Sequence, residues 1–152
     1  TTKAFANPPI HKIHDVTNTP QWRSAEIPSS NGHGTGAAVA RFYGALACGG
    51  CLDGVRVLSA QAIERARSEH SCGPDEVLKT NTRFGLGFLL PQPNVAMGPH
   101  EKAFGHPGMG GSLGFADPEA RIGFGYVMNR SQGNILIDDR PAALIEALYR
   151  SL

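Results

Sequence analysis

Residues 104–130, FGHPGMGGSLGFADPEARIGFGYVMNR, constrain the fold more than any other stretch of the chain. A glycine-rich segment at 105–114 follows an aromatic start and leads into an apolar pair. Asp117-Pro118 favours a turn, and apolar residues alternate over 122–128, as is typical of a half-buried strand. The pattern predicts strand, glycine-rich loop, strand, tight turn and strand, which together form a small antiparallel meander.

The remainder of the chain predicts helices that flank this meander, and the fold class is therefore α+β. Thr35 is a suitable helix cap, and Leu58 and Ile63 have the spacing of a hydrophobic staple around a helix that starts at Ser59. Residues 1–30 are rich in proline and lack a sustained period, so we expect an extended, loop-rich arm with Trp22 as its anchor. A last helix is expected to be capped by Asp138 or Asp139. The predicted elements are helices 35–47, 59–68 and 139–150, and strands at about 84–90, 103–107, 112–116 and 121–129, all within residues 31–152.

Two glycines in the last predicted strand indicate close packing on one face. Gly123 and Gly125 alternate with Ile122, Phe124 and Tyr126, so one face of this strand has no side chains. Glycine weakens a strand, and its presence indicates that something approaches the backbone closely. A helix packed tightly on the sheet is the simplest candidate.

Composition narrows the class of protein. The 152 residues suffice for one domain, and 14 basic residues against 13 acidic ones give no reason to expect nucleic acid or an anionic membrane as partner. No apolar run is long enough to cross a bilayer, and the N-terminal residues lack the core of a signal peptide. Three cysteines cannot form a complete disulfide framework, which favours a reducing, cytoplasmic location.

Four motifs in sequence order carry a resemblance to a known family. His106-Pro107-Gly108 precedes Gly110-Gly111 and a hairpin that ends in YVMN, residues 126–129. Upstream lie SSNGHGT at 29–35, the spaced leucines and LDG of residues 46–59, and FGLGF at 84–88. From about Ile27 onward the chain resembles serine β-lactamase-like hydrolases, which include class C β-lactamases and penicillin-binding-protein-like esterases. The resemblance implies the C-terminal portion of a β-lactamase/transpeptidase-like fold.

The resemblance implies a substrate-binding and oxyanion site at residues 106–109. His106 takes the place of the family's lysine, and Pro107 and Gly108 complete its third motif. The backbone N–H of Met109 would be one of two donors to the developing oxyanion, and Gly108 would leave room for an acyl group. Pro107 has no hydroxyl to bind a carboxylate, which favours an ester or amide over a β-lactam. The alternative is a structural histidine at a glycine-rich strand entry.

The family's other two motifs do not precede these residues. No Ser or Thr has a lysine three positions later, and no Tyr-x-Asn or Tyr-x-Ser occurs before His106. Gly110 to Gly114 matches the nucleophile-elbow pattern Gly-x-Ser-x-Gly, but an elbow needs a helix after Ser112, where a hairpin is predicted. We therefore expect a C-terminal fragment, or a truncated relative, of a hydrolase that forms an acyl-enzyme. Alone it has no complete catalytic set and is expected to be inactive.

The same resemblance also implies which partners this chain would bind. In the family the strand matching 122–129 lies inside the sheet and pairs with a strand from the N-terminal part. Without that part, its edge and its glycine-bearing face would lack partners, so the chain would bind the missing portion or self-associate through this strand. The substrate would be a small ester or amide, with no cofactor, nucleic acid or membrane involved.

The rival hypothesis is a non-catalytic binding or assembly module, either with or without a structural zinc. Cys48, Cys51, His70 and Cys72 supply two pairs of soft ligands of the kind that structural zinc sites use. The His-x-Cys pair is tighter than the usual spacing, and the resemblance implies no metal here. His11 and His14 are also spaced as ligands on a helix, although Pro8 and Pro9 argue against a helix there.

Overall fold

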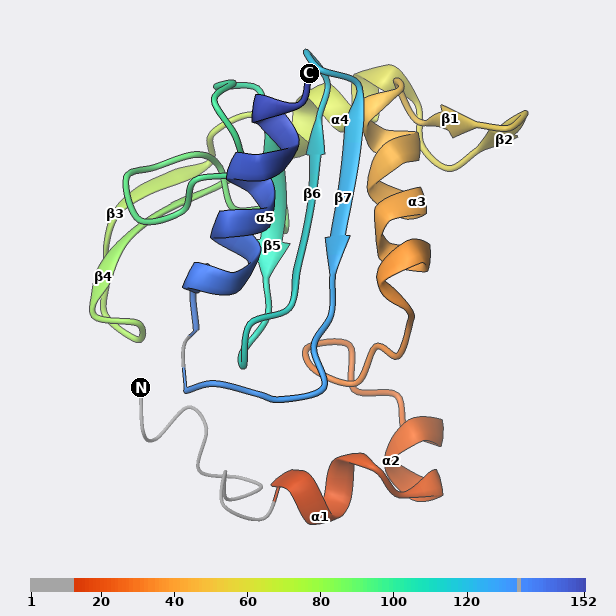
Figure 1. The fold of residues 1–152 in the computed structure, drawn as a ribbon, viewed down its shortest axis with the longest axis vertical. Helices are drawn as coiled ribbons and strands as arrows, with labels where there is room; N and C mark the ends of the chain where they lie inside the picture. The colour runs from red at the N-terminus through yellow and green to blue at the C-terminus, as the bar shows by residue number, and fades with distance from the viewer. Residues whose placement is uncertain (1–12, 134) are drawn as a thin grey trace. The chain divides into compact units, whose positions relative to one another are not determined.

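The computed structural model describes residues 13–133 and 135–152 (Figure 1). The chain divides into two compact units. The first unit contains the N-terminal residues through Gly34 and the segment Pro74–Thr80, and the second contains Thr35–Gly73 and Asn81–Leu152. Within the described residues no helix is both long and apolar enough to cross a membrane.

The N-terminal unit contains two short helices where an extended arm was predicted. They are α1 (Ile13–Thr17) and α2 (Pro20–Ser24). Thr19 caps α2 by accepting a hydrogen bond from Trp22 N at 3.2 Å, and Pro20 supplies the fixed φ that suits a first helical turn. Trp22 is buried, and its carbonyl accepts a hydrogen bond from the Asn31 side chain at 3.0 Å. The prediction of an extended arm overlooked Thr19 and Pro20 as signals of a helix start. Residues 1–12, which include His11, and the side chain of His14 lie outside the described residues.

The larger unit is built on the predicted antiparallel meander. The strands β5 (Phe104–Pro107), β6 (Leu113–Asp117) and β7 (Ile122–Tyr126) form a sheet in the order β5-β6-β7. Phe115 lies opposite Gly105 on one side and Phe124 on the other. The β6–β7 turn forms at Asp117, whose carboxylate accepts hydrogen bonds from the N–H groups of Glu119 and Ala120 at 2.9 and 3.2 Å. The predicted meander and α+β class are confirmed.

Helix α3 (Gly36–Ala47) covers the glycine-bearing face of the sheet. A Cβ atom added to Gly123 would lie 2.0 Å from Gly44 N, and one added to Gly125 would lie 2.3 Å from Gly36 O. The helix backbone therefore rests directly on the strand backbone, as the two glycines predicted. The expectation that this face lacks a packing partner is wrong, because a helix of the same chain fills that role.

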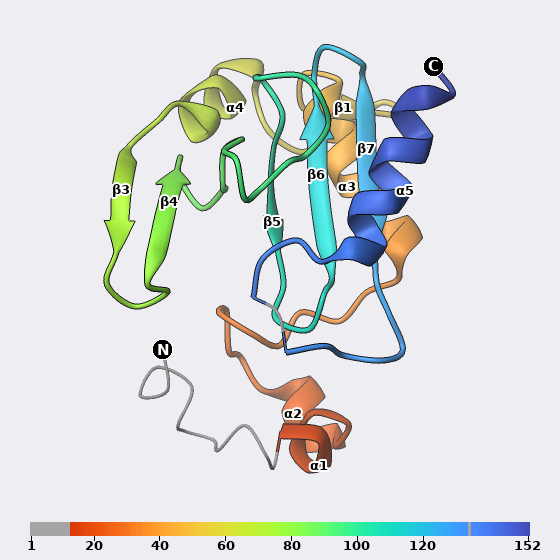
Figure 2. The same cartoon turned by 60° about the vertical axis from the view of Figure 1, so that its left-hand side comes forward.

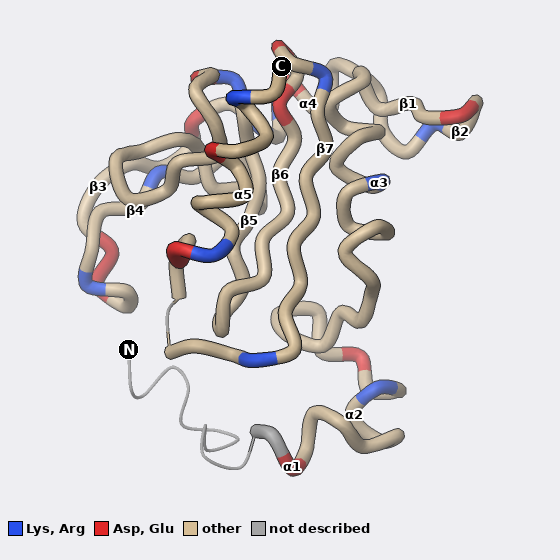
Figure 3. Tube along the Cα trace, viewed as in Figure 1, with Lys and Arg blue, Asp and Glu red and all other residues tan. Residues whose placement is uncertain are grey.

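Helix α5 (Asp139–Arg150) lies on the other face of the sheet (Figures 1 and 2). Its Ile145 packs in one apolar cluster with Leu113 and Phe115, whereas Tyr43 and Leu46 of α3 pack in another with Phe104. The strands β5, β6 and β7 contain one charged residue, Asp117, and the other charges lie outside the sheet (Figure 3). Side-chain alternation along the three strands thus separates two cores.

The predicted strand at 84–90 is wrong. Gly85 N donates to Phe88 O at 2.9 Å, and Gly87 has a φ of 78°, so the glycines form a turn. A Cβ atom on Gly85 would lie 2.2 Å from Ala66 O, which places this turn against the end of α4 (Ala60–Arg67). From this segment Leu89 pairs with Gly105 of the sheet. Glycine alternates with apolar residues at 84–88 because the turn requires glycine at 85 and 87, and not because the segment is a strand.

Four further strands form two small hairpins. The strands β1 (Cys51–Leu52) and β2 (Val55–Arg56) pair around Asp53-Gly54, where both residues have positive φ. The strands β3 (Ser71–Asp75) and β4 (Thr80–Phe84) form the other pair. Neither hairpin was predicted, and both are too short for periodicity to reveal.

Candidate functional site

The loop at 108–112 connects the end of β5 to the start of β6. Gly108 N donates to Ser112 O at 2.7 Å, and Gly111 N donates to Gly108 O at 3.1 Å. Gly110 and Gly111 have φ values of 97° and 114°, which side-chain-bearing residues rarely adopt. The glycine-rich sequence is therefore required by a tight loop that closes on itself.

Met109 lies in this loop, with its side chain 42% exposed. Of the hydrogen bonds within the described residues, none has the Met109 N–H as its donor. An oxyanion donor needs such an N–H, because a group already paired inside the protein cannot donate to a substrate oxygen. The loop thus leaves available the N–H that the resemblance singled out.

His106 and Pro107 end the strand before this loop. His106 is exposed, and its Nδ1 lies 2.7 Å from Pro107 O. Its ring centroid is 6.1 Å from that of Phe84. Burial raises the pKa of Tyr43 to about 12, an effect that its hydrogen bond to the His106 backbone partly offsets. Tyr43 is therefore a neutral hydroxyl at physiological pH that supports the strand from α3.

Gly108 has a structural reason to be glycine that differs from the predicted one. A Cβ atom there would lie 2.1 Å from the Oγ of Ser112, a residue of the same loop. The role that the resemblance implies, which is to leave room for an acyl group, stays a prediction. Strand β6 follows Ser112, so the nucleophile-elbow geometry is absent there.

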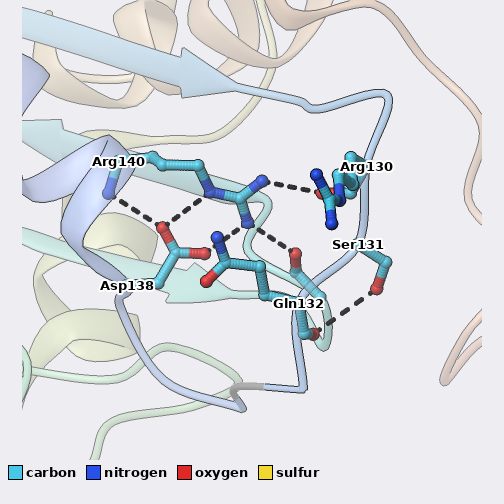
Figure 4. A network of polar contacts seen from close by, with 6 residues as sticks. Arg130, Ser131, Gln132, Asp138 and Arg140 are labelled. Carbon is cyan, nitrogen blue, oxygen red and sulfur yellow. Dashed lines mark hydrogen bonds and ion pairs between the residues drawn. The ribbon is translucent and has the colours of Figure 1, made fainter.

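An ion pair at the start of α5 contacts the same loop (Figure 4). Asp138 caps α5 by accepting from Arg140 N at 2.9 Å, which decides between the two predicted caps. The Arg140 guanidinium holds the pKa of the Asp138 carboxyl below its usual range. Arg140 also donates through Nη2 to Gly110 O at 3.0 Å and through Nη1 to Arg130 O at 2.7 Å. Sequence reasoning missed this contact, because Arg140 and Gly110 are 30 positions apart.

A second polar cluster lies at the opposite end of β6. Asp117 is fully buried, accepts a hydrogen bond from the Tyr149 hydroxyl, and has its Oδ2 2.6 Å from Nδ1 of His100. Burial opposes ionisation of Asp117, but these hydrogen bonds outweigh it and lower the pKa of the carboxyl. Tyr149-Arg150-Ser151, which fits Tyr-x-Ser by its letters, therefore ends α5 with its hydroxyl paired to Asp117. This cluster holds α5, the β6–β7 turn and His100 together.

The predicted zinc ligands do not form a site. No group of three or more His, Cys, Asp and Glu side chains in the described part of the chain is placed to hold a metal ion. Cys48, Cys51 and Cys72 are free thiols, and the His70 ring lies 3.3 Å from Ser68 Oγ at the end of α4. Nothing among the described residues favours the zinc-stapled alternative.

Comparison with known proteins identifies the family. The sequence model of the Beta-lactamase family matches residues 3–148. The chain is 41% identical, over 117 residues, to the Mycobacterium tuberculosis protein described as Esterase/beta-lactamase LipL; the match covers 76% of this chain and 26% of LipL.

Solved structures show the same relationship. The crystal structure of a family VIII carboxylesterase superposes with a TM-score of 0.91 at 45% identity and covers 99% of this chain and 40% of that one. A penicillin-binding protein homologue from Caulobacter crescentus has a TM-score of 0.84 at 45% identity, with 89% and 36% covered. EstA from Arthrobacter nitroguajacolicus has a TM-score of 0.78 at 29% identity, with 91% and 37% covered.

All these relatives are longer than the present chain. It spans 26% of LipL and 40% of the carboxylesterase. The matches nevertheless cover nearly all of the chain, including the sheet, both helical layers and the loop at 108–112. This chain therefore belongs to the Beta-lactamase family of serine β-lactamase-like hydrolases.

Proposed function

We propose that these residues supply the C-terminal wall of the active site of a serine hydrolase that cleaves a small ester through an acyl-enzyme. The observation that carries the proposal is the loop at the end of β5. There the motif at His106-Pro107-Gly108 is followed by Met109, whose N–H donates no hydrogen bond within the described residues. Because the chain has no Ser-x-x-Lys, we propose that the nucleophile lies in a portion of the protein outside these 152 residues.

The proposed reaction uses the loop only to stabilise charge. The serine oxygen of that other portion attacks the ester carbonyl and transfers its proton to a neighbouring base, and the carbonyl oxygen becomes an oxyanion. Met109 N–H donates to this oxygen, together with the N–H of the nucleophile. Collapse of the intermediate expels the alcohol, and attack by water then releases the acid and regenerates the serine.

An ester or amide is preferred over a β-lactam as substrate for two reasons. Pro107 supplies no hydroxyl at the position where a carboxylate-binding one would be expected from the resemblance. The names of three relatives (LipL, the family VIII carboxylesterase and EstA) point to esters, although that of LipL also includes β-lactamase. Short p-nitrophenyl esters are therefore the first substrates to test, with nitrocefin as the comparison.

The experiment compares two substitutions at Met109 in a form of the protein that carries the nucleophile. Met109→Pro removes the N–H and should lower kcat for a p-nitrophenyl ester by about 10²–10³-fold, the usual cost of losing one oxyanion donor. Met109→Ala keeps the N–H and removes only an exposed side chain, so its kcat should stay near the wild-type value. Equal activity of the two variants would place the oxyanion site elsewhere.

A further inference from the structure

Arg140 uses its guanidinium to join three separate segments of the chain (Figure 4). It contacts both carboxylate oxygens of Asp138, with Nη2 2.6 Å from Oδ2 and Nε 3.1 Å from Oδ1. The same side chain donates to Gly110 O in the loop at 108–112 and to Arg130 O in the segment after β7. Gly110 O accepts a second hydrogen bond at 3.0 Å from Gln132 N. The carbonyl in the middle of the loop is thus held from two directions.

The carboxylate of this ion pair is buried and the guanidinium is partly buried. The Asp138 side chain is 4% exposed and that of Arg140 is 28% exposed. A Cβ atom on Gly111 would lie 2.2 Å from Asp138 Oδ2 and 2.4 Å from Arg140 Nη2, so the loop backbone rests directly on the pair. Charge-assisted hydrogen bonds in such surroundings are stronger and more directional than exposed ones.

The contact fixes the part of the loop that contains the proposed donor. Gly110 follows Met109 directly, and the loop is closed at its base by the hydrogen bond from Gly108 N to Ser112 O. Gly110 O lies in the same peptide plane as Gly111 N–H, which donates to Gly108 O at 3.1 Å. Gly108 O in turn lies in the peptide plane that carries Met109 N–H. Holding Gly110 O therefore restrains the donor's peptide plane through this hydrogen bond. Donors to an oxyanion act only when they are already in place, and a displacement of about 1 Å can cost about 10²-fold in rate.

We propose that Arg140 is a positioning residue for the oxyanion site and acts through Gly110 rather than by touching the substrate. This proposal rests on the proposed function, in which Met109 N–H stabilises the oxyanion. The fork of the guanidinium is essential, because Asp138, Gly110 O and Arg130 O lie in different directions from it. A lysine ammonium is a compact point charge and lacks this fixed fork geometry.

The test is made in the form of the enzyme that carries the nucleophile, with Arg140→Gln, Arg140→Lys and the control Arg150→Gln. Arg150 belongs to the same helix, but its partner is the exposed Glu146. We expect Arg140→Gln to lower kcat by about 10- to 100-fold with little change in KM. Its affinity for a boronic acid, which forms a tetrahedral adduct with the serine, should fall by a similar factor. Arg140→Lys should be intermediate, and Arg150→Gln should resemble the wild type.

Amide hydrogen exchange of the peptide that spans residues 108–112 gives a readout that does not need activity. Arg140→Gln should speed exchange in this loop while β6 and β7 keep wild-type protection, and Arg150→Gln should change neither. If Arg140→Gln does not fold, Asp138→Asn serves instead, because its amide oxygen can still accept from Arg140 N. Asp138→Asn should lower kcat and boronate affinity and speed exchange in the loop at 108–112, each by less than Arg140→Gln.

Three results separate this proposal from the proposed function. Wild-type kcat, boronate affinity and loop exchange in Arg140→Gln, alongside a strong defect in Met109→Pro, would overturn the positioning role and leave the oxyanion site in place. A lower melting temperature with unchanged kcat would also overturn it, because Arg140 would then only stabilise the start of α5. An unimpaired Met109→Pro would instead overturn the proposed function itself.

Discussion

At the scale of single residues, Asp117 shows how one buried carboxylate can organise a corner of the fold. Its carboxylate accepts hydrogen bonds from the backbone of its own turn and from the Tyr149 hydroxyl of α5. It also contacts His100, which lies in the loop before β5. A fully buried charge is costly unless such partners satisfy it. Because those hydrogen bonds lower its pKa, Asp117 is ionised at neutral pH and can pair with a protonated His100.

This pair predicts a stability that depends on pH. The hydrogen bond to Asp117, together with the charges of Asp117 and Glu119, raises the pKa of His100 above its ordinary 6.5, although burial opposes the shift. Because the pKa is higher in the folded state, the pair contributes its full stability below about pH 6.5 and loses it as pH rises through the raised pKa. The wild type should exceed His100→Gln in free energy of unfolding by more at about pH 6 than at about pH 9 in urea titrations. A difference that does not vary with pH would contradict the ion pair.

At the scale of elements, the contact between α3 and β7 depends on glycine. Gly123→Ala would place a methyl group 2.0 Å from Gly44 N and 2.4 Å from Ala40 O, and neither backbone atom can rotate away. Overpacking of this kind costs about 1–3 kcal/mol or more. The melting temperature of a chain of this length should then fall by about 3–10 °C.

Gly133→Ala is the matched control for this prediction. A Cβ atom on Gly133 has no neighbour within 4 Å, and its φ is not in the left-handed region. Its melting temperature should stay within about 1–2 °C of the wild type, as for surface substitutions that alter stability by about 0.5 kcal/mol or less. If both alanine variants melted alike, α3 would not rest on β7 as closely as described.

The elements differ in how far the sequence could predict them. The meander, α3 and α5 are each specified by caps, turns or hydrophobic periods among residues close together in the sequence. Their predicted secondary structure is confirmed. Residues 84–90 mimic a strand, because glycines needed for a turn against Ala66 happen to alternate with apolar residues. The ion pair of Asp138 and Arg140 could not be predicted to meet Gly110, since no local pattern links residues 30 positions apart.

At the scale of the whole molecule, the outer edge of β7 is the surface where we propose that a partner binds. Among the described residues no strand pairs with that edge, and unpaired strand edges act as templates for further strands. We propose that the portion carrying the nucleophile pairs there, and that the 152-residue chain alone binds that portion or self-associates. A substitution at Phe124 would not test this edge alone, because the Phe124 ring stacks on Phe115 with their centroids 5.1 Å apart.

Light scattering of the 152-residue chain at micromolar concentration measures this directly. We expect a mass that rises with concentration for the chain alone. When the nucleophile-bearing portion is added, the mass should become that of one chain plus one copy of that portion, independent of concentration. A compact monomer that melts cooperatively and does not bind that portion would contradict it. The chain would then close the edge of its own sheet.

We propose that these residues complete a serine hydrolase but do not contain its nucleophile. Hydrolysis of a p-nitrophenyl ester by the repurified 152-residue chain, measured beside the form that carries the nucleophile, tests this proposal. The chain alone should hydrolyse the ester only at the buffer rate, since loss of the nucleophile removes several orders of magnitude in rate. Turnover by the chain alone that disappears in Ser112→Ala would instead make Ser112 the nucleophile and overturn the proposal.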